Sequence, residues 1–286
     1  MKVRILGTAA GGGSPQWNCG CAECEDARTT GRSRTQDGVA VSGDGHAWYL
    51  VNASPDLRAQ LLATPELSPP AGTRDTPVRG VLFTSAELDH TLGLLGLREA
   101  AELDVYATAW VHEALTTAFP LHIVLSGYTR VHRHDVRDGE PVELAGGLRV
   151  TATVLSAKRP RYASEQAPGA AVSAYRFDAG GRAFVYAPGL AAWSPEFETA
   201  IDDADVVALD GTFFTEDEMG PARPASGMGH LAVREQLPLV QARPRTRFLF
   251  THLNNTNPLL RPDAPETAEV VAAGAAVAFD GQSLEL

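Results

Sequence analysis

Three potential metal ligands, Glu87, Asp89 and His90, stand where an expected strand ends and an expected helix begins. The apolar run 78–83 before them has the length of a strand, and the leucines from Leu92 onward have helical spacing. In layered α/β folds, ligands gather beyond the carboxyl ends of strands, where a turn can direct neighbouring side chains to one ion. An Asp at a helix N-terminus is also a common cap, so this segment alone leaves a metal site and a structural role equally open.

The three cysteines form a second cluster, with the spacing C-x-C-x-x-C: Cys19, Cys21 and Cys24. Thiolates this dense can hold one soft or borderline cation, which in a cytosolic protein is usually zinc. Because the chain has no other cysteine, a disulfide framework is not expected. The pattern predicts a metal-binding loop at about 15–30, whose fourth ligand comes from elsewhere in the chain or from water.

Further ligand candidates lie at the ends of two other apolar runs. Asp210 ends the run 205–210, and His252 follows the run 248–251. His230 lies between them in a glycine-flanked loop. Each residue is a weak signal alone, but three of the kind favour a metal centre at one rim of a sheet over coincidence.

A basic loop and a group of histidines have less specific patterns. Lys158, Arg159 and Arg161 lie in the loop 156–168 and could bind a carboxylate, although solvation is the commoner role of such a group. No carboxylate or cysteine cluster accompanies the remaining histidines of the middle region. We interpret these as surface or hydrogen-bonded polar residues: His122, His132 and His134.

Length, composition and charge narrow the function classes. The 286 residues are 44% apolar and 21% charged, which is ordinary for a globular protein. The net charge of -11 argues against a nucleic-acid surface, which needs a basic footprint. No run approaches the roughly 18 apolar residues that span a bilayer, and residues 1–7 favour a first strand over a signal peptide. We therefore expect a cytoplasmic protein without a membrane partner.

The elements that must position these ligands fall into two sets, one running to about residue 118 and one beginning at about residue 148. Each set contributes ligands at strand ends. This division predicts an α/β fold, a four-layer αββα sandwich with the site in the cleft between its two sheets. Helices are expected at 54–62, with Ser54 as cap, at 92–101 and at 109–118.

Several longer stretches resemble one family. Ser85-x-Glu87-x-Asp89-His90 occupies the frame of the H-x-H-x-D-H signature of the metallo-β-lactamase superfamily, with both leading histidines replaced. The chain as a whole is similar to the pyrroloquinoline quinone (PQQ) biosynthesis protein B family of that superfamily, and the stretches that carry the similarity are 7–19, 50–56, 204–213, 228–231 and 252–258. The resemblance implies a single metallo-β-lactamase-like domain over residues 1–286.

The resemblance also implies two metal sites. A structural Zn2+ would be held by the three cysteines, with Asn255 where related phosphodiesterases place a histidine as the fourth ligand. The active-site metal would fall on Asp89, His90, Asp210 and His252, and the candidates near it are Glu87, His230 and Asn254.

The activity attributed to the family is Fe2+- and O2-dependent hydroxylation of a tyrosine ring in a Glu–Tyr-derived PQQ precursor. In that reaction His230, Asp210 and Asn254 would act as catalytic groups. Lys158, Arg159 and Arg161 would pair with the carboxylates of the precursor. The superfamily's mid-chain histidine and its bridging aspartate are missing near 155–158 and 186–189, which argues against a binuclear zinc hydrolase.

Other readings stay open. The chain could be a non-catalytic carrier for PQQ or its precursor, or a zinc hydrolase of the phosphodiesterase kind. An inactive site beside a structural zinc is a further alternative. Other divalent metals could replace Fe2+, and a homodimer is as compatible with the sequence as a monomer.

Overall fold

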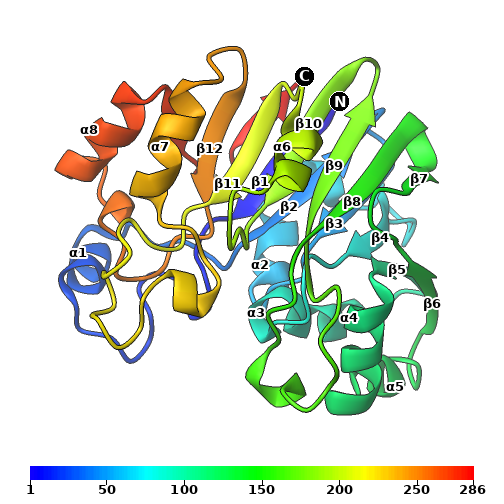
Figure 1. Cartoon of the computed structure of the whole chain (residues 1–286). Coiled ribbons are helices and arrows are strands. Elements are labelled where there is room, and N and C mark those ends of the chain that lie inside the picture. The colour runs from blue at the N-terminus through cyan, green and yellow to red at the C-terminus, as the bar shows by residue number, and fades with distance from the viewer.

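Two sheets of seven strands form the centre of the computed structural model, which describes residues 1–286 (Figure 1). The first sheet has the order β14 (Ser283–Glu285), β1 (Lys2–Gly7), β2 (Gly38–Ser42), β3 (Trp48–Val51), β4 (Val78–Leu82), β5 (Glu102–Ala107), β6 (Arg130–Asp135). The second has the order β13 (Ala275–Val277), β12 (Arg247–Thr251), β11 (Val206–Asp210), β10 (Arg182–Ala187), β9 (Val172–Ala179), β8 (Leu148–Ser156), β7 (Pro141–Leu144).

Parallel strands dominate the half of each sheet that carries the expected ligands. Strands β3 to β6 are parallel neighbours in the first sheet, and β10 to β13 are parallel neighbours in the second. The carboxyl ends of β4, β11 and β12 are therefore free to present their following loops at the edge of a sheet.

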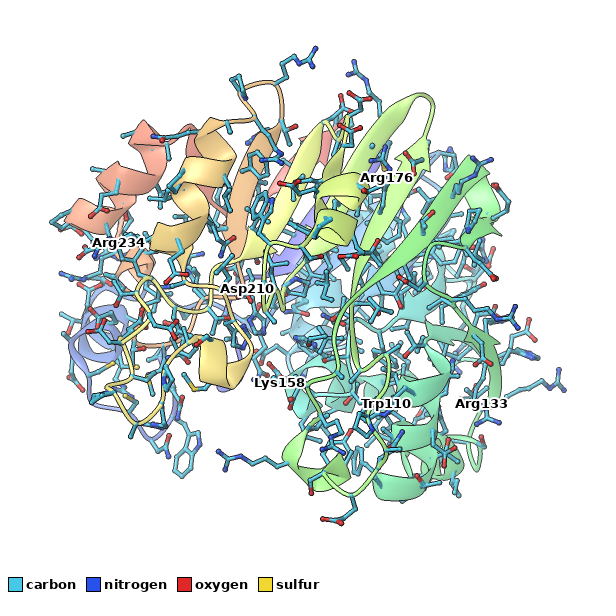
Figure 2. The ribbon with its side chains drawn as sticks, in the orientation of Figure 1. Trp110, Arg133, Lys158, Arg176, Asp210 and Arg234 are labelled. Atoms are coloured by element: carbon cyan, nitrogen blue, oxygen red, sulfur yellow. The ribbon has the colours of Figure 1, made fainter.

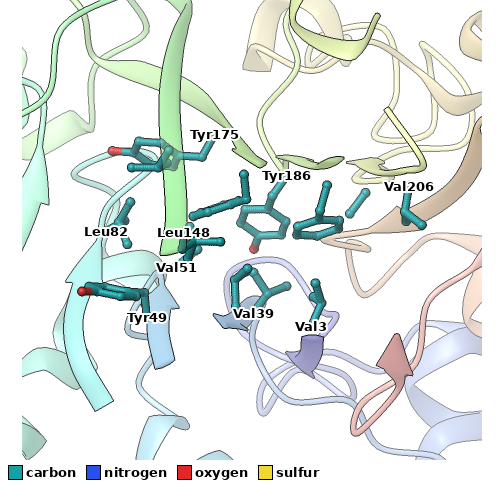
Figure 3. Packing of buried hydrophobic residues seen from close by; sticks show 14 of the residues in the cluster. Val3, Val39, Tyr49, Val51, Leu82, Leu148, Tyr175, Tyr186 and Val206 are labelled. Atoms are coloured by element: carbon teal, nitrogen blue, oxygen red, sulfur yellow. The ribbon is translucent and has the colours of Figure 1, made fainter. Parts of the chain in front are cut away.

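The two sheets pack face to face across a buried apolar layer. Val3, Val39 and Val51 of the first sheet meet Leu148 and Tyr186 of the second (Figure 3). Strands β2, β3 and β11 are buried at every position, which explains why they read as continuous apolar runs rather than as alternating ones.

Helices cover the outer face of each sheet. Two further apolar clusters lie between sheet and helices, one on each side of the molecule. The helices are α1 (Ala22–Thr30), α2 (Leu57–Leu62), α3 (Leu88–Thr91), α4 (Ala109–Glu113), α5 (Leu121–Leu125), α6 (Pro195–Ile201), α7 (Val233–Gln241) and α8 (Pro265–Ala272). The expected four-layer αββα sandwich is thus confirmed.

Short helical turns complete the connections. They are η1 (Pro65–Leu67), η2 (Leu92–Leu97), the π-helical turn η3 (Ala114–Ala118), η4 (Ala145–Gly147), η5 (Arg161–Ala163), η6 (Ser226–Met228) and η7 (Pro258–Leu260).

Some expected boundaries were wrong. The helix expected over 92–101 is the 3-10 turn η2, which ends at Leu97. Ser54 does not cap the helix that follows, because that helix begins at Leu57 and Asp56 occupies the cap position. The division into two sets is also incomplete, since β14 returns from the C-terminus to pair with β1.

Candidate metal centre

Loops from both sheets bring the strand-end ligands together. Asp89 and His90 lie in the first turn of α3, just after β4, while Asp210 ends β11 and His252 follows β12. His90 and His252 are 162 residues apart in sequence, yet their Nε2 atoms are 3.3 Å apart. Asp89 Oδ2 lies 3.6 Å from His252 Nε2 and 3.9 Å from His90 Nε2.

Hydroxyl groups fix the orientation of both imidazoles. His90 Nδ1 lies 2.8 Å from Ser85 Oγ and 3.3 Å from Thr84 Oγ1. His252 Nδ1 lies 2.8 Å from Thr212 Oγ1, whose hydroxyl donates to Asp210 Oδ1 at 2.6 Å. With Nδ1 donating to oxygen in each ring, both Nε2 lone pairs are available to one ion, which is the arrangement that metal-binding histidines use.

The backbone at His252 is held in an unusual conformation. Its φ of 58° is in the left-handed region, which non-glycine residues adopt at a cost of roughly 1–3 kcal/mol. The neighbouring Leu253 is bonded by its N–H to Thr8 O, and its carbonyl accepts from Ala10 N–H. These bonds to the loop that follows β1 hold the segment and direct His252 toward Asp89.

Asp210 connects His230 to His252. Its Oδ2 accepts from His230 Nδ1 at 2.7 Å and from Leu190 N–H at 2.8 Å, while its Oδ1 accepts two bonds from Thr212. The His230 ring stacks on His252 with 5.8 Å between ring centroids. Asp210, His230 and His252 thus form a second group whose donor atoms lie within 4.8 Å of one another.

Charge coupling divides the two histidines. Burial lowers the pKa of His90 to about 4, against the opposing charge of Asp89. Burial also acts to lower the pKa of His252, but the hydrogen bond and charge of Asp89, with Asp37 and Asp210, raise it to about 9. Burial alone would raise the pKa of Asp89, but the charges of the two histidines and the hydrogen bond to His252 hold it well below its usual range. The metal-free site therefore holds one imidazolium beside a carboxylate at neutral pH.

The donor atoms of Asp89, His90 and His252 fit a metal ion. Metal–ligand bonds of about 2.1 Å in a tetrahedron place neighbouring donors roughly 3.4 Å apart, close to the 3.3–3.9 Å between these three atoms. One carboxylate and two neutral imidazole nitrogens suit zinc and divalent iron alike.

The three cysteines also converge. Their Sγ atoms lie within 4.8 Å of one another. Asn255 packs against them, with its backbone carbonyl oxygen 3.4 Å from Cys21 Sγ and its side-chain Nδ2 3.5 Å from Cys24 Sγ. Three thiolates supply three of the four ligands of a closed zinc site. The structure thus places the expected fourth residue next to the cluster.

A pocket of about 640 Å³ opens over the metal ligands. Of the residues expected near the metal, Glu87, His230 and Asn254 all line it, but Glu87 is not among the grouped donor atoms. Asn254 Nδ2 donates to Thr256 Oγ1 at 2.6 Å, so the amide oxygen of Asn254 can accept a hydrogen bond from another partner.

The basic loop borders the same pocket, and its three cations differ in their contacts. Lys158, which Figure 2 labels together with Asp210, is exposed and is coupled by charge to Glu87, Asp210 and Asp89. Arg159 donates to the backbone carbonyl of Gln166, and this bond joins two parts of the same loop. Arg161 is exposed.

The other histidines have structural partners. His134 bonds Asp104 at 2.6 Å, and His132 lies 3.4 Å from Glu102, as expected of polar surface residues. His122 is the hydrogen-bonded kind: it is buried, with its Nε2 3.2 Å from Nδ1 of His112.

Sequence patterns did not reveal the residues that orient the ligands. Ser85, Thr84 and Thr212 are hydroxyl residues, which occur in most turns, and their spacing carries no metal signal. Their positions are the only signal that could have identified them. Ser85 lies in the superfamily frame, and Thr212 lies two residues after Asp210.

Comparison with known proteins agrees with this geometry. The αββα sandwich with ligands at its strand ends is that of the metallo-β-lactamase superfamily, and the model of the beta-lactamase superfamily domain matches residues 47–253. A PhnP-family diphosphatase shares the fold, with a TM-score of 0.71 at 20% identity over 100% of this chain and 97% of that one.

The chain belongs to the coenzyme PQQ synthesis protein B family. It is 39% identical to the protein of that name from Stutzerimonas stutzeri over 304 aligned positions. It is also 39% identical to the protein of that name from Methylococcus capsulatus over 305 positions. Each alignment covers 100% of both chains. The crystal structure of Zn(2+)-bound PqqB from Methylobacterium extorquens superposes with a TM-score of 0.90, at 34% identity and 100% coverage of both chains. The family expected from the sequence is thus confirmed.

No helix of the structure has both the length and the apolar composition needed to cross a bilayer.

Proposed function

We propose that the chain acts in PQQ biosynthesis as an Fe2+- and O2-dependent hydroxylase of the tyrosine ring in a Glu–Tyr-derived precursor. Its family membership supports the pathway. The observation that supports the reaction type is the donor set, two imidazoles and one carboxylate converging at one point. That set, with open positions beside it, is typical of non-haem Fe(II) oxygenases.

The residues at the superfamily's other ligand positions favour an oxygenase over a binuclear hydrolase. Ser85 stands in the signature frame and bonds His90 rather than offering a nitrogen to a metal. The segment 155–158, where a further histidine is expected, has none, and Pro188 stands in the segment 186–189, where the bridging aspartate is expected. A bridging hydroxide between two zinc ions needs the fuller ligand set.

Asp89, His90 and His252 would hold Fe2+, which when bound would supply the activation of O2. One oxygen atom of O2 would replace a ring hydrogen as hydroxyl, and the other would leave as water with two electrons and two protons from an external reductant. Asp210 fixes the ring of His230 through Nδ1, so the remaining Nε2 is the atom that exchanges a proton with the substrate's phenol. Asn254 can orient the substrate through its amide oxygen. Lys158 and Arg161 provide cations for the precursor's carboxylates.

At the second site we propose that Cys19, Cys21 and Cys24 hold a structural Zn2+, with Asn255 beside it. The test is metal analysis and thermal unfolding of Cys24→Ser. Loss of one equivalent of zinc and a lower Tm are expected, whereas an unchanged zinc content would contradict the assignment.

The hydroxylase proposal is tested by anaerobic loading with Fe2+, followed by air, the precursor and a small-molecule reductant such as ascorbate. We expect the wild type and the exposed control Glu165→Gln to take up O2 and to consume the precursor. We expect His252→Ala and Asp89→Ala to do neither. Activity that survives either ligand variant would contradict the proposal. Precursor bound unchanged without O2 uptake would favour a carrier, and phosphodiester turnover without O2 would favour a hydrolase.

A further inference from the structure

Two opposite charges face the pocket without a partner in the protein. Glu87 uses its backbone N–H and carbonyl for bonds to Ser85 and Thr91, while its carboxylate makes neither a hydrogen bond nor an ion pair. The ammonium group of Lys158 also lacks both kinds of contact. Both side chains line the pocket over the metal ligands and influence each other by charge alone.

Glu87 is placed by the turn that carries the metal ligands. It occupies the N-cap position of α3 in extended conformation, with φ -61° and ψ 147°, but its side chain does not cap the helix. The half-buried carboxylate is instead directed to the pocket, beside the metal donors but outside their group.

Gly229, which also lines the pocket, leaves room for the side chain of Lys158. A Cβ built on Gly229 would lie 2.3 Å from Lys158 Cδ and 3.1 Å from its Nζ, so the lysine stem crosses the space that any other residue would fill. Gly229 also has a φ of 86°, which other residues rarely adopt. This glycine therefore lets the lysine reach over the loop that leads to His230.

Glu87 is half-buried and Lys158 is exposed, and neither charge has a partner in the protein, so each is open to a ligand of opposite charge that enters the pocket. Glu87 favours a cation and Lys158 favours an anion, and both face one pocket. A single ligand that satisfies both is a zwitterion, of which the free head of an α-amino acid, with its ammonium and carboxylate, has the required charges.

We propose that Glu87 and Lys158 are specificity residues that bind the ammonium and the carboxylate of a free amino-acid head on the substrate. This inference rests on the proposed function only for the identity of the substrate that carries the head. It assigns Glu87 to substrate binding rather than to the metal.

The test is a binding measurement that needs no turnover. Titration calorimetry of the Zn2+-loaded protein would compare L-tyrosine, N-acetyl-L-tyrosine and L-tyrosinamide as probes. We expect the wild type to bind L-tyrosine about tenfold or more tightly than either blocked form, since each has lost one charge.

The variants separate the two charges. Glu87→Gln is expected to bind L-tyrosine more weakly than the wild type does, so that L-tyrosine and N-acetyl-L-tyrosine bind it equally well. Its metal content should stay complete. Lys158→Met is expected to remove the preference for L-tyrosine over L-tyrosinamide and to keep the preference for L-tyrosine over N-acetyl-L-tyrosine. Glu165→Gln and Lys2→Met, both on the exposed surface, are matched controls that should behave as the wild type does.

Three results would overturn the inference: no binding of L-tyrosine to the wild type, equal binding of the blocked probes, or loss of the active-site metal in Glu87→Gln. Because Zn2+ replaces Fe2+ and O2 is not used, these results do not depend on hydroxylation. A failure of the hydroxylase proposal would appear instead as absent O2 uptake with the probe preferences intact.

Discussion

His252 takes part in both groups of potential ligands. Its Nε2 approaches Asp89 and His90, and its ring stacks on His230. Its Nδ1 is held through the Thr212 hydroxyl by Asp210. The buried Asp210 thus orients both His230 and His252, which gives it a positioning role even if it does not touch the metal.

Removing the Thr212 hydroxyl tests this orientation. Thr212→Val keeps the shape of the side chain but leaves His252 Nδ1 without its acceptor, so we expect metal affinity to fall by about 10–100-fold. Metal competition titrations would measure the change. Thr212→Ser keeps the hydroxyl and should bind metal as the wild type does; equal loss in both variants would show that the hydroxyl is not the cause.

Metal affinity should depend on pH through His252. Its folded pKa of about 9 lies above the ordinary value of 6.5, so the imidazolium stabilises the metal-free fold fully below about pH 6.5, and this contribution is lost as the pH rises through 9. The metal needs the neutral ring. We therefore expect the apparent affinity to rise about tenfold per pH unit up to about pH 9.

Titration with Mn2+ would measure this dependence at the active site, because thiolates bind Mn2+ poorly. An affinity that stays constant between about pH 6.5 and 9 would contradict the protonated state of His252.

At the scale of elements, the segment that carries Asp89 and His90 is fixed by a close approach of backbones. Gly93 N–H donates to Ala53 O, and Ala53 N–H donates to His90 O. A Cβ on Gly93 would lie 1.9 Å from Ser54 O, so only glycine allows η2 to approach the loop after β3.

Gly93→Ala should therefore disturb both the fold and the site. We expect the free energy of unfolding in urea to fall by about 1–3 kcal/mol, since backbone atoms must separate, and metal affinity to fall with it. Gly96, in the same 3-10 turn, has no atom within 4 Å of a built Cβ. Gly96→Ala should change stability by less than about 0.5 kcal/mol, and equal effects at both positions would rule out the backbone contact as the cause.

Elements were predictable where one face or both faces are apolar and less so where the chain turns. The runs that became β4, β11 and β12 were long enough to identify, and their ends located the four strand-end ligands. The end of η2 was not predictable, because the leucines that suggest a helix continue the pattern while the backbone tightens to 3-10 geometry.

At the scale of the whole molecule, the sandwich was predictable as a class because two sets of strands each needed a partner layer. The return of β14 to the first sheet was not, since three residues give no periodic signal. The contact between His90 and His252 depends on the packing of both sheets, and no local pattern could measure it.

The unpaired charges of Glu87 and Lys158 were likewise invisible in the sequence. Their residue types suggested a metal ligand and a carboxylate-binding group, but only the fold shows that both face one pocket without contact. Their separation by 71 positions in the chain (158 minus 87) has no meaning until the two halves are joined.

The measurement that tests the central claim most directly is mass spectrometry of the precursor after one turnover by the Fe2+-loaded protein under 18O2 with a reductant present. We predict that the tyrosine ring gains oxygen that carries the heavy isotope, and that His252→Ala abolishes the gain. A precursor recovered without added oxygen, or with oxygen that comes only from water, would contradict the account of this protein as an oxygenase.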